Sequence, residues 1–517
     1  MLLAMATAIV KVIGALYKIP LNAIIGEQGF GYYSTAYEIY TVLLMISTAG
    51  LPVAMSRMIS QASSLGNYRQ VRKIYTVSRT IFLSLGLIGS LLMTLFCKQL
   101  AAFQEQPDAW AAIGTLGPCC FLICLMSTYR GFFQGQSNMI PTSVSQVLEA
   151  VCKLIVGIAA ALLIKFYWHS IPLAAGGAIF GVTMSCLISS FYLNRCFRKA
   201  FKAMPVSDEP VDSGKDIAKG LLAIAIPITI GSAGLQILTV LETKIYMSQL
   251  LTFLTQDLAD TQKGIYNMTQ TIFNMPCAFI TPITISIIPA ITAQITAGDA
   301  KAARATEESA VRVTGLISAP CAVGLAVLAE PVTALLGGYT GERLALATSL
   351  MTVLGICIVF NALVLLTNAI MQAHGHVNLP VINMFIGGAV KLIAVFILTG
   401  NENIGILGTP IGSLLCYLCI TVLNLFTIRR VLPEAPAILR NVLRSILAAA
   451  LMGAVVFGCW YGITAALGSV SRIIACGVPI AIGVVVYLIA VIKLKAITKD
   501  DCLLLPKGEK IAKFLHL

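Results

Sequence analysis

The sequence predicts an all-α polytopic membrane protein with about 14 transmembrane helices. Of its 517 residues, 58% are hydrophobic and only 11% are charged, and the mean hydropathy is +0.90. A soluble globular chain carries about 25% charged residues, so this composition excludes a soluble enzyme. Apolar windows of about 20 residues, the length that crosses a bilayer, recur along the whole chain between short gaps. The protein is therefore expected to lie almost entirely in a membrane.

The predicted helices follow one another with short connections. The chain opens on MLLAMATAIVKVIGALYKIP, which has no small-residue cleavage site before the next polar stretch, so this segment is predicted to be the first membrane helix and not a removable signal. The predicted windows are residues 4–25, 33–56, 76–97, 109–133, 141–166, 173–194, 219–247, 266–293, 311–335, 344–370, 379–400, 406–428, 441–465 and 472–492.

Basic residues alternate between the two sides of the predicted membrane. Most of the 35 Lys and Arg residues lie in every second gap, within 57–79, 195–219, 301–312 and 429–444, and in the tail after residue 492. By the positive-inside rule these gaps and both termini are cytoplasmic. The net charge of +13 thus orients helices and meets anionic membrane lipids, and it is not a nucleic-acid signature. The intervening gaps hold only Lys98, Lys165, Lys263, Arg343 and Arg472.

An internal repeat predicts two lobes of six helices each. The segments RGFFQGQSNMIPTSVSQVLEAVCKLIV and NAIMQAHGHVNLPVINMFIGGAVKLIA both place a Gln and a Lys nineteen residues apart, as Gln134 and Lys153 and as Gln372 and Lys391. The longest cytoplasmic gap, which contains PVSDEPVDSGKD, separates the two lobes. We expect an N-terminal lobe over 1–210, a C-terminal lobe over 211–432, two further helices within 433–494 and a basic cytoplasmic tail over 495–517.

Charged and polar side chains inside the predicted spans mark a candidate substrate cavity. Each charge near the midplane costs about 2.5–3.5 kcal/mol on insertion scales, so such residues are expected to face a partner or water. Basic groups outnumber acidic ones, which suits an anionic head group such as a pyrophosphate, and amides such as Gln146 can hydrogen-bond sugar hydroxyls. The candidate cavity residues are Lys11, Lys18, Arg130, Gln134, Glu149, Lys153, Gln372 and Lys391.

Some of these residues also have a purely structural interpretation. Glu149 and Lys153 are four residues apart and can form an ion pair on one helix face. Arg130 stands near a helix end, where its guanidinium can extend to lipid phosphate as an interfacial anchor. Both interpretations stay open at this point.

The sequence contains none of the usual motifs of enzymes or metal sites. There is no Walker A motif, no H-E-x-x-H pair and no Ser/His/Asp constellation. Cys416 and Cys419 form a C-x-x-C, but no second pair or nearby His completes a metal site. The 15 cysteines lie mostly in apolar segments, where a free thiol acts as a small hydrophobe. We expect a transporter with no catalytic site, no cofactor and no bound metal.

Several segments resemble a known superfamily. KVIGALYKIPLNAIIGEQGFGYYSTAYEIY, STAGLPVAMSRMISQ and STYRGFFQGQSNMIPTSVSQVLEAVCKLIVG resemble the polysaccharide-transporter branch of the multidrug/oligosaccharidyl-lipid/polysaccharide (MOP) exporter superfamily. The resemblance is closest to its stage V sporulation protein B group, which is related to lipid II flippases. It covers essentially the whole chain, including G-I-Y-N at 264–267.

The resemblance implies a MATE-like fold and a monomeric flippase of the bacterial plasma membrane. Its substrate would be an undecaprenyl-pyrophosphate-linked saccharide, either a lipid II-like wall precursor or a polysaccharide repeat unit, moved from the inner to the outer leaflet by alternating access. Lys11 and Lys18 are similar to the basic residues that the superfamily's lipid II flippases carry on helix one. The last two helices, by resemblance to fourteen-helix members, form a groove for the lipid tail.

Two other functions remain open from the sequence. A cation-coupled multidrug exporter of the same fold would need an acidic coupling site deep in a lobe, for which Glu38 and Glu242 are the candidates. A nontransporting scaffold for wall-synthesis enzymes is the other alternative. Sodium, protons or the membrane potential could each drive transport.

Overall fold

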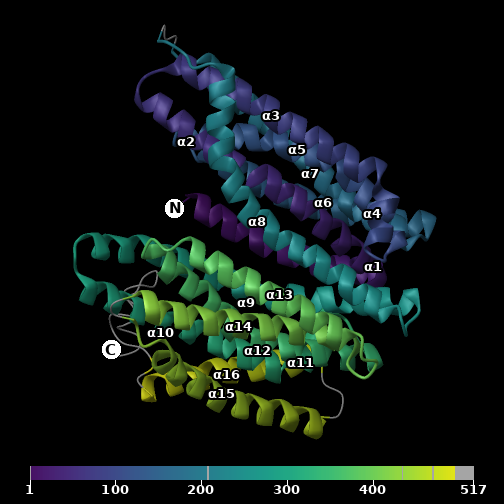
Figure 1. Ribbon diagram of the computed structural model, residues 1–517. Helices are drawn as coiled ribbons and strands as arrows, with labels where there is room; N and C mark the ends of the chain where they lie inside the picture. The colour runs from purple at the N-terminus through teal and green to yellow at the C-terminus, as the bar shows by residue number, and fades with distance from the viewer. Residues whose placement is uncertain (1, 206–208, 433–434, 468–470, 495, 497–517) are drawn as a thin grey trace. The chain divides into compact units, whose positions relative to one another are not determined.

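The computed structural model describes residues 2–205, 209–432, 435–467, 471–494 and 496. In this part of the chain every regular element is helical (Figure 1), and twelve helical stretches are long and apolar enough to cross a membrane. Packing divides the chain into two compact units, Met1–Asn267 and Met268–Leu517, with the boundary inside one long helix. The predicted all-α membrane architecture is confirmed.

The first unit is a helical bundle that ends within α9. In it α5 packs against α1, α2, α3 and α7, while α6 packs against α1 and α7, so that α1, α5 and α6 meet. α8 packs against α1, α2 and α3. The elements are α1 (Leu2–Thr48), α2 (Leu51–Ser64), α3 (Tyr68–Leu95), α4 (Cys97–Phe103), η1 (Pro107–Ala109), α5 (Trp110–Gly135), α6 (Ile140–Trp168), α7 (Ile171–Lys202), α8 (Gly214–Leu250) and the first turns of α9 (Gln256–Thr296).

α1 is a hairpin of two helices joined at Gly26. Gly26 has φ 72° and ψ 178°, which glycine adopts without the steric penalty of a Cβ atom. The ring centroids of Tyr17 and Tyr33 lie 6.2 Å apart, whereas a straight helix would separate these residues by about 24 Å. The predicted windows 4–25 and 33–56 are therefore both present, and the second continues into α2 after Thr48.

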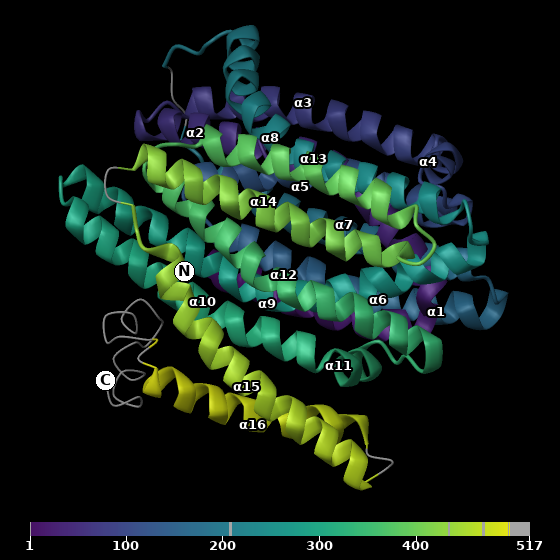
Figure 2. The same ribbon diagram turned by 60° about the horizontal axis from the view of Figure 1, so that its bottom comes forward.

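The second unit holds the rest of α9 and the remaining helices. α10 packs against α12 and α15, α13 packs against α14, and α15 and α16 lie side by side (Figures 1 and 2). Its apolar core joins α9, α10, α12, α14 and α15 through residues such as Ile291, Val311, Leu366, Ile428 and Val442. The further elements are α10 (Ala300–Val327), α11 (Ala329–Leu336), α12 (Gly341–Ala373), α13 (Asn378–Thr399), η2 (Gly405–Leu407), α14 (Gly408–Val431), α15 (Ile438–Leu467) and α16 (Arg472–Lys493).

The internal repeat of the sequence recurs in the backbone. Ser137, between α5 and α6, has φ 57°, and Gly375, between α12 and α13, has φ 84°. In each turn the residue's N–H donates at 3.0 Å to the carbonyl of the repeat glutamine, Gln134 or Gln372. The next N–H bonds back to a helix carbonyl at 2.9 Å in both turns. The two glutamines therefore occupy equivalent positions in two turns of the same geometry.

Each of the fourteen predicted windows overlaps a helix of the described chain. The window 311–335 is divided between α10 and α11, and α9 begins at Gln256, well before the predicted 266–293, because its first turns are polar. The division into two six-helix lobes stays a prediction, since the compact units reflect packing and not the repeat. Of the predicted tail 495–517, only Ala496 lies within the described residues.

Candidate functional site

An ion pair joins α5 to α6 in the first unit. Arg130 Nη2 lies 3.0 Å from Glu149 Oε2, and Arg130 Nε donates to Ser145 Oγ at 3.1 Å. The two charged side chains are 19% and 26% exposed, so their attraction is weakly screened. The four-residue spacing of Glu149 and Lys153 left an ion pair on one helix open. In the structure the ion-pair partner of Glu149 is Arg130 on the neighbouring helix. The guanidinium of Arg130 is thus bound to α6, which does not fit a lipid-facing anchor.

Lys153, one turn further along α6, lies among tyrosines of α1. Its Nζ donates to Tyr37 Oη at 2.7 Å, and it lies 4.6 Å from the Tyr37 ring centroid and 5.2 Å from the Tyr17 ring centroid. A desolvated ammonium over an aromatic face gains about 2 kcal/mol. Tyr17 is itself held by a hydrogen bond to Ala178 O at 3.2 Å. These neutral partners hold the ammonium in place without cancelling its charge.

These groups line one cavity of about 260 Å³ where α1, α5 and α6 meet. Its two basic side chains outnumber its single carboxylate, so the cavity carries an excess of positive charge, and the neighbouring residues of α1 give it an apolar wall. We call it the head-group cavity, after the anionic head group expected from the sequence. Its lining residues are Val10, Ile13, Gly14, Tyr17, Arg130, Gln146, Glu149, Ala150 and Lys153.

Two further predicted cavity residues, Lys11 and Lys18, lie on α1. Lys18 is half-buried and lies within electrostatic reach of Glu38 and Lys153. Lys11 lies in the α1 helix, but its side chain falls outside the described residues. The structure therefore brings Arg130, Glu149 and Lys153 together and places Lys18 near them.

The remaining predicted cavity residues lie elsewhere. Gln134 is half-buried at the C-terminal end of α5, and its backbone carbonyl belongs to the turn that follows. In the second unit, Lys391 is half-buried on α13, and Gln372 is exposed at the end of α12. The repeated turn accounts for the two glutamines, whose carbonyls accept its hydrogen bonds.

A row of tyrosines on α1, close to Lys153, was not predicted from the sequence. Tyr33, Tyr37 and Tyr40 share one face of α1 because they are four and three residues apart. Their successive ring centroids lie 4.9 Å and 5.9 Å apart. This spacing was a usable signal. Tyr17, which lines the head-group cavity, reaches Tyr33 only because the chain turns back at Gly26.

A second polar cluster surrounds Glu38, one of the two predicted coupling acids. Glu38 Oε2 lies 3.7 Å from Lys263 Nζ, and the Lys263 side chain is 0% exposed. Lys263 was expected in a gap between helices; the structure instead buries it in the second turn of α9, because that helix begins before its apolar window. The other acid, Glu242, is buried on α8 and acts electrostatically on Tyr246, as Glu38 does.

The second unit contains a neutral polar network. Asn424 of α14 is fully buried and donates to Thr367 Oγ1 and Asn368 Oδ1, both at 2.8 Å. Asn383 of α13 donates to Asn424 Oδ1 at 2.9 Å. This amide network joins α12, α13 and α14 without any formal charge, and its hydrogen bonds stay within the protein.

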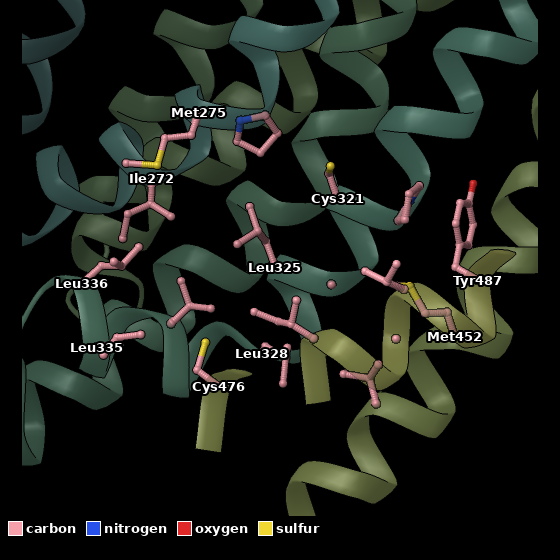
Figure 3. Close-up of a pocket in the computed structure, with 18 of the residues that line it drawn as sticks. Ile272, Met275, Cys321, Leu325, Leu328, Leu335, Leu336, Met452, Cys476 and Tyr487 are labelled. Carbon is pink, nitrogen blue, oxygen red and sulfur yellow. The ribbon is translucent and has the colours of Figure 1, made fainter. Parts of the chain in front are cut away.

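The second unit also encloses an apolar cavity of about 620 Å³, lined from α9, α10, α11, α15 and α16. Figure 3 shows Ile272 and Met275 on one side of it and Met452 and Tyr487 on the other. The hydroxyl of Tyr487 already donates to Leu316 O at 2.8 Å. The lining therefore offers hydrocarbon and sulfur contacts, which suit an apolar ligand.

The described residues hold no group of three or more His, Cys, Asp or Glu side chains that could bind a metal ion. Cys416 is buried and Cys419 is partly buried, both on α14.

The chain matches two known family models. The model described as polysaccharide biosynthesis protein matches residues 1–294, which is more than half of the chain. The MatE model matches residues 237–397. Both matches fall on helices described above.

Two proteins of Bacillus subtilis (strain 168) are similar to the chain over most of its length. The stage V sporulation protein B is 26% identical over 439 residues, covering 84% of this chain and 83% of the relative. The lipid II flippase MurJ is 23% identical over 407 residues, covering 76% of this chain and 75% of the relative.

The fold is also that of a solved transporter. A structure of the lipid II flippase MurJ in an inward closed conformation superposes with a TM-score of 0.71 at 14% identity, covering 95% of this chain and 97% of that chain. This likeness establishes the fold, and the family match establishes the descent. The chain belongs to the polysaccharide biosynthesis protein family.

Proposed function

We propose that the protein is a flippase that moves an undecaprenyl-pyrophosphate-linked saccharide from the inner to the outer leaflet by alternating access. The substrate is a lipid II-like wall precursor or a polysaccharide repeat unit. The head-group cavity, with its excess of basic groups, is the observation that carries this proposal. Membership of the family and similarity to proteins named for sporulation and for lipid II flipping support it.

The anionic head group would bind in the head-group cavity. Arg130 and Lys153 offer charge-assisted hydrogen bonds to phosphate oxygens, which are about twice as strong as neutral ones. Glu149 holds Arg130 in place and moderates the positive field, so that the anion can leave after transport. Lys18 would extend the basic surface along α1, and a contact of Lys11 with the head group remains a prediction. Contacts of the sugars with Gln134, Gln372 and Lys391 remain predictions.

The apolar cavity of the second unit would receive part of the lipid tail. It is lined by hydrocarbon from five helices, including the last two, α15 and α16. Each buried methylene contributes about 0.8 kcal/mol, so a few isoprene units suffice for useful affinity. This assignment agrees with the tail groove that the resemblance implies.

The transport cycle would proceed in the bacterial plasma membrane. With both termini in the cytoplasm, an inward-open state admits the head group, and rocking of two six-helix lobes exposes it outside. A monomer, surrounded by anionic lipids, suffices for this cycle. The protein performs no covalent chemistry in this proposal and needs no cofactor.

A cation-coupled multidrug exporter is the alternative. The MatE match over residues 237–397 favours it, and Glu38 and Glu242 would be its coupling acids. Two observations weigh against it: the head-group cavity has a positive excess that repels cationic drugs, and Glu38 already faces the ammonium of Lys263.

Reconstitution into proteoliposomes separates the two functions. A fluorescent lipid-linked disaccharide pyrophosphate placed in one leaflet should reach the other in vesicles with protein, and stay in place in protein-free vesicles. Excess unlabelled lipid of the same head group should compete, whereas a cationic dye should neither compete nor be exported. Dye export without lipid movement would establish the alternative.

A further inference from the structure

Lys263 is a fully buried ammonium outside the head-group cavity. Its side chain is 0% exposed, its Nζ donates to Thr35 Oγ1, and it lies 3.7 Å from Glu38 Oε2. Removing a charge of this size from water costs several kcal/mol even after relaxation. The fold must therefore supply oxygens that compensate this ammonium.

Those oxygens form a connected set between α1, the α4–α5 connection and α9. Thr35 Oγ1 donates to Gln106 Oε1, and Gln106 Nε2 donates to Asp260 Oδ1 at 2.7 Å. Tyr32 Oη donates to Asp260 Oδ2 at 3.1 Å. Both Glu38 and Asp260 act electrostatically on Lys263. The set provides carboxylate, hydroxyl and amide oxygens around one positive charge.

Glu38 contributes a carboxylate oxygen that can still accept a further ligand contact. Among the described residues, Glu38 Oε2 is buried and has no close hydrogen-bond donor, and the Lys263 ammonium 3.7 Å away compensates its charge. Carboxylate and other oxygen atoms are the ligands that hard cations prefer. The niche formed by Glu38, Thr35 and the neighbouring Asp260 therefore has the chemistry of a site for a small hard cation.

Gly264 explains how α9 comes close enough to fill this niche. A Cβ atom at Gly264 would lie 1.8 Å from Glu27 O, so only glycine allows this approach of α9 to α1. Lys263 immediately precedes Gly264 in the sequence. The G-I-Y-N element of the sequence thus begins with the residue that permits the contact.

We propose that this niche is a sodium-type cation site whose cation the chain itself supplies. The Lys263 ammonium is tethered where a monovalent metal ion would otherwise bind, and it fixes the first turns of α9 to α1. Glu38 therefore does not take up a cation from solution while Lys263 is in place. The inference concerns this cation and not the transported saccharide, so it stands apart from the proposed flippase function.

Removing the tethered ammonium should create a metal-ion site. The full-length protein in detergent is unfolded thermally at fixed ionic strength, with sodium chloride replaced stepwise by choline chloride. We expect Lys263→Ala to show a saturable rise of its midpoint in sodium, on the order of 2 °C at ten times the dissociation constant. The wild type should show no rise, and neither should Lys263→Met, which fills the volume without charge.

A further variant tests which oxygen binds the ion. Lys263→Ala combined with Glu38→Gln should lose the sodium response. The proposal is overturned if Lys263→Ala responds to sodium no more than this double variant does. It is also overturned if the wild type shows a saturable sodium response that Glu38→Gln removes, because Glu38 then already binds a cation from solution.

If Lys263→Ala does not fold, a double-mutant cycle of Glu38 and Lys263 tests the proposal instead. Glu38→Gln leaves the buried ammonium without its carboxylate, and Lys263→Met leaves the carboxylate without its ammonium, so each should lower the midpoint. The double variant Glu38→Gln with Lys263→Met should unfold no lower than the worse single variant. Additive lowering would show that the two charges act independently and would contradict the proposal.

Discussion

The α5–α6 hairpin of the first unit and the α12–α13 hairpin of the second share a backbone and differ in chemistry. Both turn through a left-handed residue, Ser137 or Gly375, with the same hydrogen bonds. Both place a lysine at the same distance beyond the turn, Lys153 or Lys391. The repeat is therefore a repeat of local geometry.

The residues that face each other across the two hairpins are different. The position of Arg130 in the repeat is taken by Asn368, and that of Glu149 by Gly387. The first hairpin is joined by an ion pair that lines a cavity, whereas Asn368 belongs to an amide network completed by Asn424. One hairpin thus presents charge to a cavity, and the other satisfies its polar groups within the protein.

The backbone geometry of a turn can therefore be kept while the charged side chains beside it change. The turn depends on backbone hydrogen bonds and one left-handed residue. Such a turn is compatible with many different neighbouring side chains. The charge depends on two side chains, which can be exchanged for neutral ones if both change together.

The largest effect on stability is expected from removing only the carboxylate of the ion pair. Glu149→Leu leaves Arg130 charged and largely buried without its carboxylate, and should lower the free energy of unfolding by about 2 kcal/mol, a value reduced for the partial exposure of the pair. Denaturant titration in detergent measures it. Loss of under 0.5 kcal/mol, within the range of ordinary surface substitutions, would mean that the pair is solvated.

Giving the first hairpin the neutral residues of the second should separate folding from transport. The double variant Arg130→Asn with Glu149→Gly removes both charges, so it should unfold less easily than Glu149→Leu alone. Its flipping rate should fall about tenfold, the loss expected for a charge-assisted hydrogen bond to phosphate. Flipping at the wild-type rate in a folded double variant would exclude the pair from head-group binding.

The amide network should contribute to stability more than to transport. Asn424→Ala removes two donated hydrogen bonds and one accepted bond and leaves buried partners, so it should lower the free energy of unfolding by about 1 kcal/mol or more. Asn403→Ala, on an exposed loop, is the matched control. If Asn424→Ala stopped flipping without affecting unfolding, the network would belong to the transport site.

The smallest effect concerns the shared turn. Ser137→Gly should raise the free energy of unfolding by about 0.5 kcal/mol, because glycine adopts φ 57° without strain. Gly375→Ser should lower it by a similar amount. Reciprocal shifts of opposite sign in thermal unfolding would establish that the two turns are equivalent, and shifts of the same sign would contradict it.

The helices and the repeat could be predicted from the sequence because both are local patterns. Apolar windows set all fourteen helical positions, and the Gln and Lys spacing marked the repeated turn. The predicted start of α9 was wrong because its first turns, which include DLADTQKG, are amphipathic and give no apolar window.

The partners of the charges could not be predicted because they come from distant parts of the chain. Glu149 was within one turn of Lys153, yet its partner Arg130 comes from the preceding helix. Lys263 meets Glu38 only after α9 packs on α1. Tertiary packing selects among several local possibilities, and periodicity does not record that choice.

The most direct test of the account is the flipping rate of Lys153→Met in proteoliposomes, measured with the fluorescent lipid-linked disaccharide pyrophosphate. Lys98→Met, an exposed lysine of the same unit outside the head-group cavity, is the matched control. We expect a loss of about tenfold or more for Lys153→Met and an unchanged rate for Lys98→Met, at equal thermal stability. Equal rates for both variants and the wild type would contradict the claim that this cavity binds the anionic head group.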